Sequence, residues 1–259
     1  YAASGSGRGV DLNNDVIAAS GTVSMSGQHN TGATYAISLS GSTSITAGTG
    51  VTLESLNDNT GTIALLSSGG IDGGSGTVLM RAANYAFGGA DRTITTTGVL
   101  TIEPDADENS FASSFDNQYL NPVSVTGLTL GKSSNASAIT LSRAISLSGP
   151  VSIYGGSIDV NANITANSGN ILLDADTGST LNQSSTGILL DDVITIETVT
   201  SGNLTLIGRS GDTGSGFDGI DASSANTTTL RSAGNLTLQG YSYAASGSGR
   251  GVDLNNDVI

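Results

Sequence analysis

The chain has 259 residues, a formal net charge of −14 and a sequence pI near 4.1. Such an acidic chain is a poor partner for nucleic acid or an anionic membrane surface, because both bind basic patches. It contains 37 Gly, 3 Pro and no Cys, and only 4% of its residues are aromatic. This composition is unusual for a globular domain and favours a thin core of small aliphatic layers. No run of roughly eighteen apolar residues occurs, so we expect no membrane insertion.

The first seventeen residues, Tyr1–Ile17, return without a single change as Tyr243–Ile259, which gives a period of 242 residues. A long internal period is the signature of an array in which each unit needs its neighbour to bury its ends. We therefore predict that residues 1–242 are one full tandem repeat, a continuous β-solenoid, and that residues 243–259 begin the next. Further copies of the same repeat, stacked end to end, are the expected partners.

One phrase recurs along the chain: a Gly, a short apolar alternation, and then polar turn residues. It begins at Gly21, Gly50, Gly76, Gly98, Gly127, Gly149, Gly169, Gly202 and Gly234. Other alternating segments lie between these phrases, at residues 35–39, 63–66, 139–141, 145–147, 158–160 and 193–196. Alternation with period two and β-branched residues predicts strand after strand, and no comparable helical periodicity is found.

These short strands decide the fold class. Strands of three to five residues cannot make a tall sandwich, but stacked coils of two or three strands make a solenoid in which each strand pairs with the coils above and below. We therefore predict an all-β fold, an elongated parallel β-helix with irregular loops. Ile171 and Leu236 are expected to point inward, and Thr205 outward.

The segment Glu103–Pro122 breaks this rhythm. It holds two of the three Pro, five acidic residues, and the aromatic residues Phe111, Phe115 and Tyr119. Pro at both ends should keep the segment out of the coil, so we predict a projecting loop whose three aromatic side chains contact a partner. The alternative is a small satellite core beneath a long loop.

Chemical motifs are sparse. Asp174, Asp176, Asp218 and Asp221 place oxygen atoms in Gly-rich turns, as calcium requires, but the simpler interpretation is that Asp forms turns. No other cofactor is expected. The single histidine, His29, has no acidic neighbour in sequence, so we predict that the chain is not an enzyme. A carbohydrate-cleaving β-helix, which needs carboxylates gathered on one face, is the third interpretation of function.

Several stretches carry a resemblance to a known family. The phrases SGNLTL and AGNLTL, the segment from Leu128 to Ala175, and the Gly, Asn, Ser and Thr turns resemble the repeat regions of large secreted bacterial surface proteins of the filamentous-haemagglutinin type. The resemblance implies a right-handed parallel β-helix, export across the outer membrane, and a place in adhesion or an extracellular biofilm matrix. It supplies no motif with assigned catalytic or binding residues.

Two classes of function follow. The first is a structural repeat of an extracellular fibre or adhesin stalk at the cell surface, which provides length and stiffness by coil stacking. The second is an adhesive module that binds glycan or a host surface through residues 103–122, with lateral self-association as a further expectation. Repetition favours the first class, because a scaffold gains reach from each copy whereas a binding site gains only avidity.

Overall fold

The computed structural model describes residues 8–29, 34–56, 60–66, 69–89, 91–105, 108–175, 185–213, 215–222 and 227–254. The chain forms two compact units, Tyr1–Ser113 with Gln118–Thr129 and Ser114–Asn117 with Leu130–Ile259. Every regular element of the described ranges is a β-strand, and the strand pairs in both units run parallel. The predicted all-β, parallel β-helix fold is confirmed.

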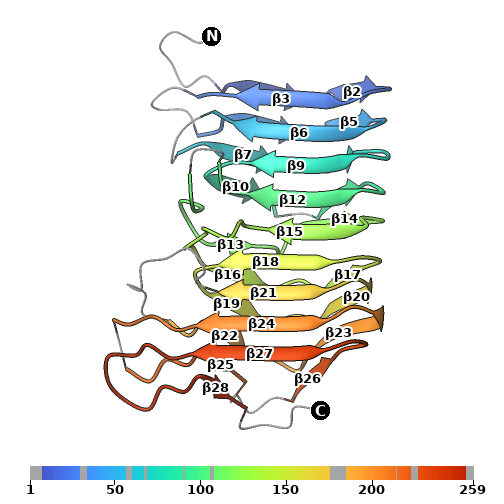
Figure 1. Cartoon of the computed structure of the whole chain (residues 1–259). Helices are drawn as coiled ribbons and strands as arrows, with labels where there is room; N and C mark the ends of the chain where they lie inside the picture. Colours follow the sequence, from blue (N-terminus) through green and yellow to red (C-terminus); the bar gives the residue numbers. More distant parts are fainter. Residues whose placement is uncertain are drawn as a thin grey trace. The chain divides into compact units, whose positions relative to one another are not determined.

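In the first unit, successive coils contribute strands to three parallel sheets (Figure 1). The first sheet contains β1 (Val10–Asn13), β4 (Ile37–Ser40), β7 (Thr62–Leu65) and β10 (Asn84–Phe87). The second contains β2 (Val16–Ala19), β5 (Ser44–Ala47), β8 (Ile71–Asp72), β11 (Arg92–Thr95) and β14 (Leu120–Val123). The third contains β3 (Val23–Gly27), β6 (Gly50–Ser55), β9 (Thr77–Arg81) and β12 (Val99–Glu103).

The second unit repeats this plan with its own three sets of strands. One set is β13 (Phe115–Asp116), β16 (Ile139–Leu141), β19 (Ile158–Val160), β22 (Ile188–Leu190), β25 (Ile220–Asp221) and β28 (Val252–Asp253). Another is β17 (Ile145–Leu147), β20 (Ile164–Ser168), β23 (Ile194–Ser201) and β26 (Thr228–Arg231). The third is β18 (Val151–Gly155), β21 (Ile171–Ala175), β24 (Leu204–Arg209) and β27 (Leu236–Tyr241). The remaining strand, β15 (Gly127–Leu130), is divided between the two units.

The core of each unit consists of aliphatic columns formed by residues in register on neighbouring strands. In the second unit, Ile153, Leu173 and Leu206 pair in sequence across β18, β21 and β24, and all are 0% exposed. Between them the outward residues, such as Thr205, are only half-buried. Burying one such Leu or Ile side chain contributes about 1.5–3 kcal/mol, so the aliphatic columns supply the main stabilisation of each coil.

The recurrent Gly phrase marks the entry to the strands. Each of its nine occurrences leads into one strand: β3, β6, β9, β12, β15, β18, β21, β24 and β27. At Gly202 the backbone has φ of 113°, and an added Cβ would lie 1.9 Å from the Gly169 carbonyl oxygen, so only Gly fits. The following Asn residues connect coils, because the Asn203 N–H donates to Asn170 Oδ1 at 2.9 Å and the Asn235 N–H donates to Asn203 Oδ1 at 2.9 Å.

The segment Glu103–Pro122 departs from the predicted projecting loop. It contains strands β13 and β14, and Pro122 itself lies in β14 opposite Ile94 of β11. The expectation that Pro keeps this end of the segment out of the coil is wrong. The second-sheet order places β14 at a sheet end, where a residue without an N–H donor is tolerated.

Candidate functional site

The last strand of the second unit, β27, has an apolar face that is not covered. Leu204 and Leu236 occupy paired positions on β24 and β27, but Leu204 is 0% exposed and Leu236 is 45% exposed. Leu236 thus occupies the inward register position that the sequence predicts, but it is not buried in this chain. The reason is that the sheet order ends at β27 among the described residues, so no further coil covers Leu236.

The first strands of the first unit are also uncovered. Strands β1, β2 and β3 are the terminal members of the sheets in the first unit, and Val16 of β2 is 75% exposed. Met25 of β3 is half-buried, whereas its register partner Leu53 on β6 is 0% exposed. The first strands of the first unit and the last strand of the second unit thus each present an unpaired edge and partly exposed apolar side chains among the described residues, which is the usual liability of a terminal β-strand.

The two copies of the repeated stretch form the same local structure where both are described. Val10 begins β1 and its copy Val252 begins β28. Strand β1 pairs with the coil that follows it, through β4, and β28 pairs with the coil that precedes it, through β25. The two copies therefore display the two hydrogen-bonding edges of one strand. Residues 1–7 and 255–259, which belong to the same predicted equivalence, lie outside the described residues.

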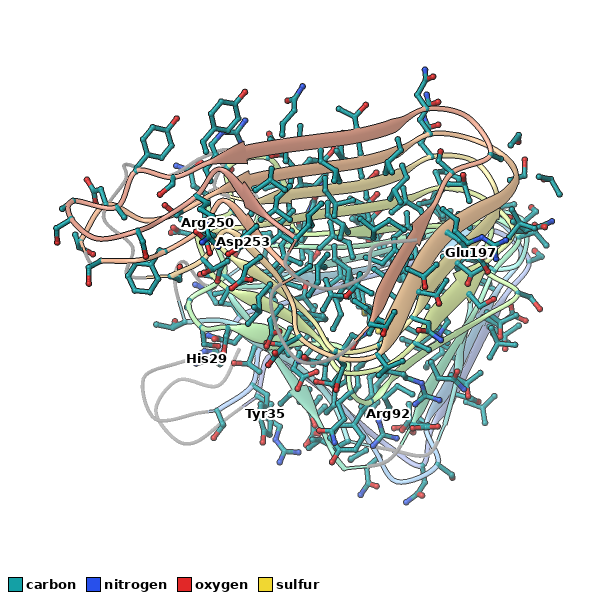
Figure 2. All side chains as sticks on the ribbon, turned by 90° about the horizontal axis from the view of Figure 1, so that it is seen from below. His29, Tyr35, Arg92, Glu197, Arg250 and Asp253 are labelled. Atoms are coloured by element: carbon teal, nitrogen blue, oxygen red, sulfur yellow. The ribbon has the colours of Figure 1, made fainter. Side chains whose placement is uncertain are left out.

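An ion pair is also repeated in the two copies. Arg8 Nη1 lies 2.7 Å from Asp11 Oδ1, and the copies Arg250 and Asp253 form the equivalent pair (Figure 2). The first pair is exposed on both sides, whereas Asp253 is only 7% exposed. Contact with the preceding coil accounts for this difference, because Asp253 pairs with Asp221 on β25.

Three carboxylates meet at this position. Asp218, Asp221 and Asp253 each provide one oxygen atom, and these three atoms lie within 4.8 Å of one another. Burial raises the pKa of Asp218, and the negative charges of Asp221 and Asp253 raise it further. The Arg250 backbone N–H donates to Asp218 Oδ1, and its guanidinium donates to Asp253 Oδ2. A basic residue of the repeated stretch thus supplies counter-charge to the cluster.

The structure divides the four calcium candidates. It brings Asp218 and Asp221 together, but calcium takes roughly six to eight oxygen ligands and Arg250 already balances part of their charge. Asp174 instead accepts a hydrogen bond from Arg209 Nη1 at 3.0 Å, and burial still raises its pKa. Asp176 lies outside the described residues. The carboxylate geometry alone does not define a calcium site.

The three aromatic side chains of the Glu103–Pro122 segment have different surroundings. Phe111 and Phe115 are each 4% exposed, and Tyr119 is half-buried. Phe111 packs edge-on against Tyr85, with ring centroids 5.8 Å apart. The expectation that the two Phe side chains project to meet a partner is wrong, because both are buried. The satellite-core alternative describes Phe111 better.

The single histidine lies close to a backbone carbonyl group. His29 is half-buried, and its Nε2 lies 3.4 Å from the Thr60 carbonyl oxygen.

The described part of the chain contains no helix long and apolar enough to cross a membrane. Comparison with family models, curated proteins and solved structures finds no match for the chain. The resemblance to filamentous-haemagglutinin-type proteins therefore stays a prediction.

Proposed function

We propose that this chain is a structural repeat of an extracellular bacterial fibre or adhesin stalk, in which successive copies stack end to end. The observation that carries the proposal is the uncovered Leu236 on β27, paired with the fully buried Leu204, in a chain whose sequence restarts seven residues later at Tyr243. The strands of a following copy would cover this side chain and pair with the open edge. An identical unit is the simplest cover, because the copy already begins in the chain.

The two copies of the repeated stretch support the same proposal. Since β28 pairs with the preceding coil and β1 with the following one, merging the two copies gives the continuous order β25, β28 and then the next β4. This continuation leaves no strand edge unpaired at the junction, as in other solenoids of tandem units. The extracellular location rests on the compositional resemblance to secreted surface proteins.

The adhesive alternative has weaker support. It relies on exposed aromatic side chains in residues 103–122, and aromatic anchors at binding surfaces must be accessible to the partner. Phe111 and Phe115 are buried, so they stabilise the fold instead of presenting a contact surface. The enzyme alternative needs carboxylates gathered on one face, and two described groups contain several: the Arg250-bridged cluster, and Asp159 with Asp116, Asp191 and Asp192. Neither group includes the single histidine, so this alternative has the weakest support.

Proteins with one, two and four complete repeats test the proposal. Nine coils at a spacing of about 4.8 Å should add about 43 Å to the maximum dimension with each repeat, as measured by small-angle X-ray scattering. The midpoint of thermal unfolding should rise from one repeat to two, because two open ends become one buried junction. A control protein joins two repeats through a flexible Gly-Ser linker. If its dimensions and unfolding midpoint equal those of the direct fusion, the stacking proposal is wrong.

A further inference from the structure

The first unit contains a buried cation for which the sequence analysis gave no role. Arg92 begins β11 and is only 3% exposed (Figure 2). Its Nε donates a hydrogen bond to the Leu65 carbonyl oxygen at 2.5 Å. Its Nη1 is buried and has no hydrogen-bond partner among the residues that the structure describes. An arginine guanidinium stays protonated in proteins, so a full positive charge lies inside this unit.

The surroundings of Arg92 are built to hold the guanidinium. A Cβ on Gly88 would lie 3.0 Å from Arg92 Nη2 and equally close to Leu66, so the absence of a side chain at Gly88 makes room for the cation. Arg92 also lines a small cavity, large enough for about one water-sized molecule. The other lining residues come from three coils: Leu39, Thr43, Leu65, Gly69, Gly70, Ile71, Thr93 and Ile94.

The charge balance of this position is unusual. Burial alone lowers the pKa of Arg92, and no described carboxylate contributes an opposing shift. In contrast, Arg81 Nε lies 2.5 Å from Glu103 Oε1, and Arg209 Nη1 lies 3.0 Å from Asp174 Oδ1. A buried charge without a counter-charge is strongly unfavourable, and the chain as a whole has ample carboxylates elsewhere, with a net charge of −14. The position therefore calls for an anion from solution.

We propose that the cavity beside Arg92 binds one small monovalent anion, such as chloride, held by the buried guanidinium. The ligand is small because the cavity is close to the size of a single water molecule and most of its lining is apolar. Oxyanions such as phosphate or sulfate are too large for this space. The bound anion neutralises Arg92 and stabilises the coils that contribute β7, β8 and β11. This inference does not depend on the proposed function.

Thermal unfolding in different sodium salts at constant ionic strength tests the proposal. Replacing gluconate with chloride should raise the unfolding midpoint by about 2–4 °C along a saturable curve. Bromide should have a smaller effect and iodide almost none, because the cavity excludes larger ions. General salt effects on stability follow the same order of halides, so only the saturable part of the response that is lost in Arg92→Met is assigned to the site. Equal responses to all the halides would overturn the proposal.

Two variants localise the effect. Arg92→Met keeps the apolar stem but removes the charge, and it should abolish the chloride-dependent shift. Arg231→Met is the matched control, because Arg231 is a largely exposed arginine 3.8 Å from Glu197 and should leave the chloride response unchanged. If Arg92→Met does not fold, crystals of the unaltered protein grown in chloride decide, with diffraction measured at a long X-ray wavelength where chloride scatters anomalously. An anomalous peak within hydrogen-bonding distance of the Arg92 guanidinium supports the site, and the lack of a peak there overturns it.

Discussion

Asp221 and Asp253 lie directly opposite each other on the parallel strands β25 and β28, so two carboxylates of like charge share one step of the ladder. Like charges at paired positions destabilise a sheet unless another group compensates for them. Asp218 adds a third carboxylate, and Arg250 bridges two of the three. Because Asp253 and Arg250 are copies of Asp11 and Arg8, the same cluster would recur at every junction between stacked repeats.

This cluster predicts that mild acid stabilises the protein. The folded-state pKa of Asp218 lies above its ordinary value of 3.8, because of burial first and then Asp221 and Asp253. Burial also raises the pKa values of Asp159 and Asp174. A raised carboxyl pKa means that the folded state binds the proton more tightly, so stability falls as pH rises from the unfolded to the folded pKa. The unfolding midpoint should therefore increase as pH is lowered from 7 towards about 4.5.

The variant Asp218→Asn assigns part of this effect to the cluster. The Asn side-chain oxygen can still accept the hydrogen bond from the Arg250 N–H, while the buried negative charge is lost. We expect the unfolding midpoint at pH 7 to rise by about 2 °C and the gain on acidification to shrink. Asp11→Asn is the control, because Asp11 is the exposed copy of Asp253 in the first unit. It should change neither the unfolding midpoint at pH 7 nor the gain on acidification. A lower midpoint for Asp218→Asn at pH 7 would contradict this interpretation.

Phe111→Ala tests whether the Glu103–Pro122 segment is a core or a binding loop. Phe111 is 4% exposed and packs against Tyr85, so its truncation should cost about 3–5 kcal/mol in the free energy of unfolding, measured by urea titration. Ser113→Ala, at an exposed side chain of the same segment, should cost less than about 1 kcal/mol. A Phe111→Ala protein with unchanged stability and impaired surface binding would restore the adhesive interpretation.

A pair of Gly substitutions tests whether close approach of the backbone requires Gly at position 208 of β24. A Cβ on Gly208 would lie 2.0 Å from the Gly219 carbonyl oxygen, so Gly208→Ala should destabilise the second unit by about 2 kcal/mol or more. A Cβ on Gly21 would have no atom within 4 Å, so Gly21→Ala should be neutral or slightly stabilising. Circular dichroism melts of both variants measure the difference. Equal losses would show that backbone approach does not select Gly208.

Alternation and Gly punctuation were enough to predict the fold. The segments at residues 139–141, 145–147 and 158–160 form strands β16, β17 and β19 with unchanged bounds, because short aliphatic alternations between Gly, Asn and Ser turns have few other buried arrangements. The segment at 193–196 instead extends to Ser201 as β23, with a register shift opposite Ala166 and Ser168. Hydrogen bonding to the neighbouring coil extends this strand, and the β-propensity of its residues does not predict that pairing.

Less of the candidate functional site than of the fold could be predicted from the sequence. The sequence contains a match between Gly219-Ile220-Asp221 and Gly251-Val252-Asp253, from which the pairing of Asp221 with Asp253 could be anticipated. The partnership of Arg250 could also be anticipated from its three-residue spacing to Asp253. The burial of Phe111 and of Arg92 could not be predicted from the sequence. It depends on which residues of neighbouring coils pack around each side chain. Long-range packing of this kind leaves no periodic signal in a single sequence.

The central claim is that a following copy covers the open end of each repeat, and Leu236→Ala measures this directly. In the single-repeat chain, Leu236 is 45% exposed and its truncation should cost less than about 1 kcal/mol. In a protein of two complete repeats, the same substitution in the first repeat should cost about 2–5 kcal/mol, as for a buried Leu. Leu204→Ala, at the buried register partner, should be costly in both proteins. An equally small cost for Leu236→Ala in one and two repeats would show that the copies do not stack on this strand.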